Sequence, residues 1–247
     1  MSRAAARVAA ATQGPKGPAM RFTGSQYLVV PEFDTNTATA FIVSFWLRLT
    51  AEPAGDEHIF TMDAGGAVPS SHAIRIGTNK RLTYVLTNSN GNGLGSWQSS
   101  ILTVGLWYHF LIRPKKGAAT TQYVSEVGSS KTWLSQTGAP PAARECVIGG
   151  NHNDGGAILD LLTSADLADF YFNPVDLDTT LVANRREFST DEGKMVDLGD
   201  AGENPTGASP YLYFRDPTDW QTGLNRGYGD NAAVTGSLKP APGIPNY

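Results

Sequence analysis

The chain has 247 residues and a formal net charge of −4 at pH 7. That length is enough to bury a full core as one large domain, and the acidic balance supplies no field that would attract nucleic acid or an anionic membrane. We therefore expect neither a nucleic-acid partner nor membrane insertion. Charged residues make up only 17% of the chain, and 27 glycines and 15 prolines separate short apolar runs, which favours many short strands joined by turns.

The first 18 residues, MSRAAARVAAATQGPKGP, are predicted to form an N-terminal arm. The alanine-rich part could form a short helix, which Gly14 and Pro15 would end. Its apolar stretch is too short for a secretory signal, and no run in the chain approaches the ~18 apolar residues of a membrane span. Because such an arm would fray in an isolated domain, we expect a neighbouring subunit to hold it, with Arg3 and Arg7 as contacts.

The clearest strand prediction covers residues 41–50, FIVSFWLRLT. Side chains alternate faces along a strand, which puts every second residue from Phe41 to Leu49 in one apolar row. A strand of this length needs an equally long apolar surface opposite it, and a second sheet would supply that surface. The predicted neighbour in its own sheet is the strand at residues 106–113.

About a dozen strands are predicted along the chain, at residues 26–30, 41–50, 57–63, 73–77, 81–87, 97–101, 106–113, 120–127, 131–134, 146–150, 166–172 and 211–214. The connection Thr78-Asn79-Lys80 indicates a hairpin in which Asn79 can take a positive φ. Only residues 177–188 have helical spacing. Many strands without alternating helices indicate an all-β, antiparallel sandwich.

The single cysteine, Cys146, excludes an internal disulfide and every multi-cysteine metal site. It opens the apolar run CVIGG, which predicts a buried thiol. The sandwich is predicted to span residues 19–188. After it the sequence becomes a loop-rich C-terminal extension, residues 189–247, which would pack either on the sandwich or on neighbouring subunits.

Six segments between residues 20 and 180 together resemble the concanavalin A-like, laminin G-like jelly roll. They are FTGSQYLVVP, VSFWLRL, IRIGTNKRLTYVLT, LTVGLWYHFLI, VIGG and LADFYF. In that family a tryptophan strand and a "W-x-H" strand lie in the core, and a late glycine pair precedes the strand that closes the sheet. The resemblance implies that His109 is a core or hydrogen-bonded histidine, not a catalytic one.

The extension has a narrower resemblance. MVDLGDAGENPTGASPYLYFRDPTDWQTGLNRGYGDNAAVTGSL is similar to the C-terminal extension of lectin-like proteins encoded among the structural genes of tailed bacteriophages. This likeness implies a virion component on the outside of the head, collar or tail.

No motif in the sequence supports catalysis. The β-glucan hydrolases of the superfamily carry E-x-D-x-x-E or E-x-D-x-E strands that supply the acid and the nucleophile. Here Glu32-Phe33-Asp34 is the single E-x-D, and no second glutamate follows it. A G-x-S-x-G elbow is absent, and the glycine-rich NGNGLG lacks the lysine of a phosphate loop. We expect no enzyme and no cofactor.

Two polar segments are candidate glycan contacts. Amides, a carboxylate and an imidazole gather at Asn151, His152, Asn153 and Asp154, where they could bind sugar hydroxyls or form an ordinary polar turn. Calcium is a remote alternative, with Asp63, Asp154 and Asp160 as oxygen ligands.

The second candidate joins Asn90 and Asn92 to Trp97, because an indole face beside amide groups suits a pyranose ring. Trp97 could equally be a core residue.

Aromatic residues in the extension indicate assembly contacts, since they bury large areas at little entropic cost. The candidates are Trp220, Tyr228 and Tyr247. The sequence therefore predicts a non-enzymatic structural protein of a phage particle, whose partners are other virion proteins or copies of itself and whose lectin-like fold could contact host surface glycans. The alternative is a stand-alone carbohydrate-binding module or a degenerate glycan hydrolase.

Overall fold

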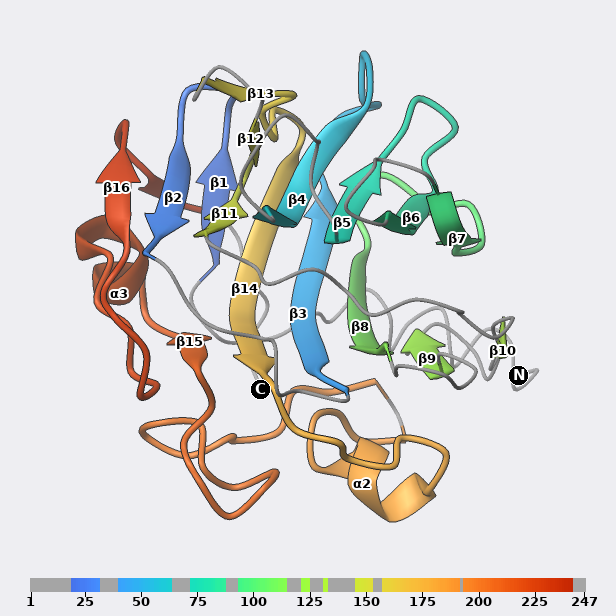
Figure 1. Cartoon of the computed structure of the whole chain (residues 1–247). Coiled ribbons are helices and arrows are strands. Elements are labelled where there is room, and N and C mark those ends of the chain that lie inside the picture. Colours follow the sequence, from blue (N-terminus) through green and yellow to red (C-terminus); the bar gives the residue numbers. More distant parts are fainter. Residues whose placement is uncertain are drawn as a thin grey trace, which may run out of the picture.

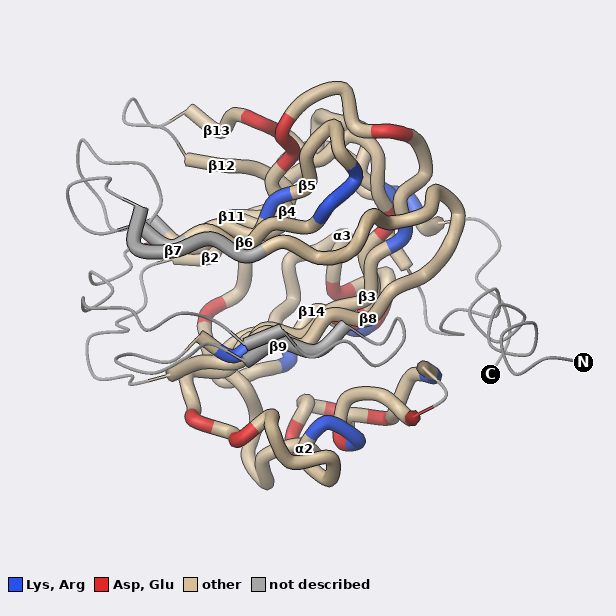
Figure 2. Tube along the Cα trace, turned by 90° about the vertical axis from the view of Figure 1, so that its right-hand side faces the viewer, with Lys and Arg blue, Asp and Glu red and all other residues tan. Residues whose placement is uncertain are grey.

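The computed structural model describes residues 19–31, 40–63, 72–87, 93–114, 121–124, 131–132, 145–152, 157–191 and 193–241. The side chains of residues 63, 86–87, 93–97, 121–124 and 131–132 lie outside this description. Within it, two antiparallel sheets stack face to face, as Figure 1 and Figure 2 show. This confirms the predicted all-β, antiparallel sandwich.

The first sheet has eight strands in the order β10-β9-β8-β3-β14-β1-β17, with β15 also pairing with β14. Their bounds are β1 Met20–Phe22, β3 Ile42–Leu49, β8 Trp107–Arg113, β9 Thr121–Val124, β10 Lys131–Thr132, β14 Ala165–Asn173, β15 Leu212–Phe214 and β17 Lys239–Pro240.

The second sheet has seven strands in the order β16-β2-β11-β4-β5-β6-β7. Their bounds are β2 Tyr27–Val30, β4 Glu57–Asp63, β5 His72–Ile76, β6 Leu82–Thr87, β7 Gly93–Gln98, β11 Glu145–Ile148 and β16 Ala233–Thr235. A separate two-stranded sheet joins β12, Asn151–His152, to β13, Ile158–Leu159.

The predicted central strand lies in the middle of the eight-stranded sheet as β3, between β8 and β14. Its inward row joins the main hydrophobic core, where Phe45 stacks on Phe110 with ring centroids 5.4 Å apart. The ring of Phe60, in the opposite sheet, packs against that of Phe170 in β14, with centroids 5.2 Å apart. The predicted pairing of residues 41–50 with 106–113 is therefore confirmed.

The outer face of the eight-stranded sheet is also buried. The segment after β14, which includes helix α2 (Val182–Arg186), forms a third layer below this sheet in Figure 2. Phe188 packs edge-on against Tyr171, with centroids 5.2 Å apart. The helix predicted over residues 177–188 is shorter than expected, because Asp178 instead caps a turn by accepting hydrogen bonds from the Thr180 amide and hydroxyl.

The β5–β6 hairpin is confirmed, but the positive φ is at Lys80 (57°) and not at Asn79. The Asn79 side chain instead accepts a hydrogen bond from the Arg81 amide, 3.0 Å away. The amide of Lys80 closes the turn on the Gly77 carbonyl.

The described part of the C-terminal extension packs on the sandwich of its own chain. Its strands β15, β16 and β17 pair with β14, β2 and β1, so they extend both sheets. Helix α3, Pro217–Thr222, begins with a capping box between Asp216 and Asp219 and ends at Gly223 in the left-handed region. It lies beside β16 at one flank of the sandwich (Figure 1).

Trp220 corrects one sequence prediction. Its side chain is fully buried, with ring centroids 5.4 Å from Phe214 and 6.1 Å from Phe22. It fills the space between the sheets at the flank that α3 covers, so it is a core residue and not an assembly contact. Two of its aromatic partners, Phe22 and Phe170, are far away in sequence, so the loop-rich local pattern did not indicate burial.

Candidate functional site

The two ends of the sandwich are built differently. At one end, here called the turn end, β1, β3, β5 and β7 finish and short connections lead into the next strands. These connections hydrogen-bond to one another and to the segment between β13 and β14. Leu102 N donates to Lys80 O, Gly24 N to Leu162 O, and Thr50 N to Ser164 O, at 2.7–3.1 Å.

Glu57 anchors the turn end. Its buried carboxylate accepts four hydrogen bonds, from the amides and the hydroxyls of Thr163 and Ser164. The amide of the next residue, His58, donates to the Asp160 carbonyl at 2.9 Å. The connection into β14 is thereby fixed against the start of β4.

The opposite end, here called the loop end, is located by strand register. Val30 pairs with Cys146, Cys146 with Met62, Met62 with His72, and His72 with Leu86. These pairings place the end of β2 before residues 32–39, both strand ends around residues 64–71, the end of β6 before residues 88–92 and the start of β11 after residues 133–144 at one end of the seven-stranded sheet. The polar segment with Asn90 and Asn92 thus begins and ends here, although both asparagines lie outside the described residues.

The β12–β13 hairpin brings the second polar segment toward the same end. After β11 the chain turns at Gly149, and β12 runs back over the outer face of the seven-stranded sheet, where Thr61 donates a hydrogen bond to the Gly150 carbonyl. His152 Nε2 then lies 3.5 Å from a carboxylate oxygen of Glu145, the first residue of β11. Both residues of β12 are half-buried.

The other predicted residues of this segment, Asn153 and Asp154, lie outside the described residues. For Trp97 the backbone alone is described, and it pairs in register with Tyr84, which is buried in the core. The choice between a sugar contact and a core role for Trp97 therefore stays a prediction.

A row of aromatic rings crosses the loop end. We call it the aromatic row; neighbouring centroids are 4.9–6.4 Å apart, and its members in order are Tyr228, Tyr211, Phe172, Phe41, His72 and Tyr84. All but one of these rings are buried. The exception is Tyr228, which is 63% exposed. The sequence predicted Tyr228 as an assembly contact; the other predicted contacts Arg3, Arg7 and Tyr247 lie outside the described residues.

Buried histidines support the framework. His72 Nδ1 lies 2.7 Å from the Tyr84 hydroxyl, and His109 Nε2 lies 2.8 Å from the Ser44 hydroxyl. Burial lowers the pKa of both imidazoles to about 3, so both are neutral at pH 7. The prediction that His109 is a hydrogen-bonded core residue is confirmed.

Buried carboxylates also have internal partners. Asp166, at the start of β14, is completely buried and accepts hydrogen bonds from Arg21 and Arg48 on the two neighbouring strands. Arg48 in turn lies over the ring of Trp107, 5.1 Å from its centroid. These side chains occupy paired positions in four adjacent strands.

Asp169 is a feature that the sequence analysis missed. It sits in a β-bulge of β14 with φ 52° and accepts a hydrogen bond of 2.9 Å from the Tyr213 hydroxyl. Burial raises the pKa of this carboxyl to about 7, against the lowering effects of Tyr213 and of the nearby Arg215. The run LADFYF offered no warning, because a bulge depends on pairing with the neighbouring strands.

Within the described part of the chain, no three His, Cys, Asp or Glu side chains are grouped so that they could hold a metal ion. A carboxylate oxygen of Asp160 lies 3.7 Å from His58 Nδ1 at the turn end. The other two predicted calcium ligands, the side chain of Asp63 and Asp154, lie outside the description, so calcium binding stays an untested prediction. No described helix is long and apolar enough to cross a membrane.

No protein-family model and no curated protein sequence matches this chain. Its fold is similar to that of a candidate carbohydrate-binding protein from Bacteroides ovatus, with TM-score 0.59 and 13% identity over 92% of this chain and 60% of the other. It is also similar to a heptameric pentraxin from Limulus polyphemus, with TM-score 0.53 and 14% identity over 90% and 96% of the two chains.

A further neighbour is the mouse laminin α1 chain, domains LG4-5, with TM-score 0.46 and 16% identity over 66% of this chain and 44% of the other. None of these three neighbours is a virion protein. At these identities the similarity establishes the fold alone: the chain has a concanavalin A-like, laminin G-like jelly-roll sandwich.

Proposed function

We propose that the protein binds glycans without cleaving them, and that the loop end is the binding site. One observation supports this proposal. Strand register brings the flanks of the segment with Asn90 and of the segment with His152 to the same end of the sandwich, and Tyr228 is exposed at that end. Sugar sites combine a few placed polar groups with an apolar or aromatic floor. The assignment of the Bacteroides ovatus neighbour as a candidate carbohydrate-binding protein agrees with this class of ligand.

The absence of catalysis is part of the proposal. Glycoside hydrolysis needs two carboxyl groups about 5–10 Å apart on either side of the scissile bond. The buried carboxylates Glu57 and Asp166 are far from the loop end and have all their oxygens occupied by internal donors. They therefore serve the fold.

The test compares binding by two matched double variants on an array of neutral and acidic glycans. Asn151→Ala with His152→Ala removes polar groups beside the loop end, and we expect at least a tenfold loss of affinity for the glycan that the wild type binds. Glu52→Ala with Lys80→Ala removes an exposed ion pair at the turn end and should leave binding unchanged. Equal binding by all three proteins would contradict the site, and release of reducing sugar from the bound glycan would contradict the absence of catalysis.

A second proposal concerns location. We infer from the likeness of residues 195–238 to phage lectin-like extensions that the protein is carried on the exterior of a phage particle, with other virion proteins as partners. This inference rests on the sequence resemblance alone. Antibody labelling of purified particles tests it, and particles that carry no label while the free protein reacts would overturn it.

A further inference from the structure

The loop that carries Tyr228 is held in one conformation by its own hydrogen bonds. The Asn225 side chain accepts bonds from the amides of Tyr213 and Gly227 and donates to the Tyr211 and Gly229 carbonyls, all at 2.8–2.9 Å. A single buried amide thus ties the loop to β15 and to the residue before it.

The glycines on both sides of Tyr228 bring the loop backbone against its neighbour. A Cβ at Gly227 would lie 2.3 Å from the Pro210 carbonyl oxygen, and one at Gly229 would lie 2.7 Å from the Tyr211 carbonyl oxygen. The amides of Tyr228 and Gly229 donate to these same two carbonyls. No larger side chain fits at either glycine, so the loop is built to lie flat on residues 210–211.

This tight loop presents a large aromatic side chain outward. The rings of Tyr228 and Tyr211 meet edge to face, with centroids 5.3 Å apart and an interplanar angle of 86°. The contact supports one edge of the ring, yet Tyr228 remains 63% exposed while Tyr211 is buried. A rigid, exposed aromatic ring loses little conformational entropy when it binds a ligand.

The charges around the ring select the ligand. Arg226, two residues before it in the chain, is paired with Asp216 and Asp219. Among the described residues Asp230, two positions after Tyr228, is exposed and has no ion-pair partner, so the loop carries an uncompensated negative charge. An anionic ligand is repelled there, whereas a neutral sugar can place its C–H face on the ring and its hydroxyls near carboxylate and amide oxygens.

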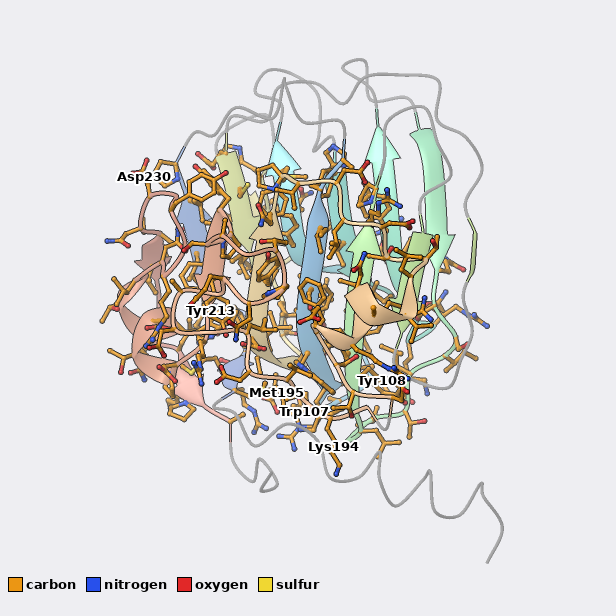
Figure 3. All side chains as sticks on the ribbon, turned by 90° about the horizontal axis from the view of Figure 1, so that it is seen from below. Trp107, Tyr108, Lys194, Met195, Tyr213 and Asp230 are labelled. Carbon is orange, nitrogen blue, oxygen red and sulfur yellow. The ribbon has the colours of Figure 1, made fainter. Side chains whose placement is uncertain are left out.

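We propose that Tyr228 is a stacking platform for a neutral pyranose at the loop end, which makes it a specificity-determining residue of the glycan site. The proposal rests on the glycan-binding function above and names the ligand as uncharged. Figure 3 shows Asp230, from the same loop, on the side of the molecule away from Trp107 at the turn end. Tyr228 lies at one end of the aromatic row and is the one ring of the row that is exposed to a ligand.

The experiment measures the affinity of the full chain for the best neutral glycan found on the array, by titration calorimetry. We expect Tyr228→Ala to weaken binding at least tenfold and Tyr228→Phe, which keeps the ring, to stay within about threefold of the wild type. Leu224→Ala, which removes another exposed side chain of the extension, is the matched control and should bind as the wild type does.

Each other result counts against the proposal in a distinguishable way. If Tyr228→Ala binds normally while the Asn151/His152 double variant does not, the platform is wrong and the glycan function stands. A preference for acidic over neutral glycans overturns the ligand class. If sedimentation shows that Tyr228→Ala dissociates an oligomer, Tyr228 is a subunit contact instead. Failure of the wild type to bind any glycan overturns both proposals.

Discussion

The turn end and the loop end of the sandwich differ in which side chains they bury and which they expose. At the turn end, polar groups face one another: Glu57 accepts four hydrogen bonds and Asp166 is enclosed by two guanidinium groups. At the loop end Arg113 pairs with Asp176 and the Asn225 side chain holds its loop, but this end also carries the aromatic row, which finishes in the exposed Tyr228. The described difference is therefore in exposure: the polar anchors of the turn end are enclosed by the fold, whereas the loop end presents an exposed aromatic ring.

The largest loss of unfolding free energy that tests this comparison is expected at Asp166. Asp166→Ala leaves Arg21 and Arg48 without their shared carboxylate in a largely buried position. Loss of one partner of a buried ion pair costs about 3–5 kcal/mol, and we expect a loss of that size in the free energy of unfolding by urea. The control is Asp191→Ala, which removes an exposed pair with Arg186 and should leave the unfolding midpoint unchanged.

The second-largest loss of unfolding free energy is expected at Glu57. In Glu57→Ala the buried Ser164 donors lose their acceptor, at a cost of about 2–4 kcal/mol for one or two orphaned groups. Glu52→Ala removes the same residue type from an exposed site of the same end and should not shift the urea midpoint. If both variants unfold alike, the turn end does not hold the register of the sandwich.

Asp169 links β14 to the extension, at a point between the two ends. Its contribution to the free energy of unfolding depends on pH. Its pKa of about 7 in the folded protein is above its ordinary value of 3.8, so between these values the folded state keeps a proton that the unfolded state releases. The stabilisation is complete below about pH 3.8 and is lost as pH rises through 7. Asp169→Asn should therefore flatten the pH dependence, by on the order of 2–4 kcal/mol across this window. Urea unfolding at pH 5 and pH 8 measures the difference, and parallel curves for variant and wild type would contradict the assignment.

The smallest effect on stability is expected at Tyr228. Its exposed ring contributes little to the core, so Tyr228→Ala should change the free energy of unfolding by less than about 0.5 kcal/mol, even though we expect it to weaken glycan binding. Thermal unfolding followed by circular dichroism measures this change. A loss above 2 kcal/mol would place Tyr228 among the structural residues and remove the contrast between the two ends.

Much of the framework could be predicted from local pattern. The alternation in residues 41–50 identified β3, the run 106–113 identified its partner β8, and CVIGG indicated a buried cysteine, which Cys146 is. These predictions succeed because side-chain alternation in a strand depends only on the pleat.

Other features could not be predicted because they depend on residues that are distant in sequence. Trp220 lies in a polar, loop-like stretch, and it is buried because β1, β14 and β15 meet around it. The strain at Asp169 follows from a register shift between β14 and β3. The position of the positive φ was a local error instead: it is at Lys80, while the Asn79 side chain accepts a hydrogen bond from the Arg81 amide.

The sequence by itself determined the class of fold and the kinds of side chain that a glycan site would use, because both depend on local periodicity and composition. Only the tertiary structure decided which of those side chains share an end of the molecule. That choice follows from strand register, which is set by pairing over more than a hundred residues, as between Val30 and Cys146. The tertiary structure likewise showed that the exposed Tyr228 continues a buried aromatic row, whereas Trp220, eight residues earlier, belongs to the core.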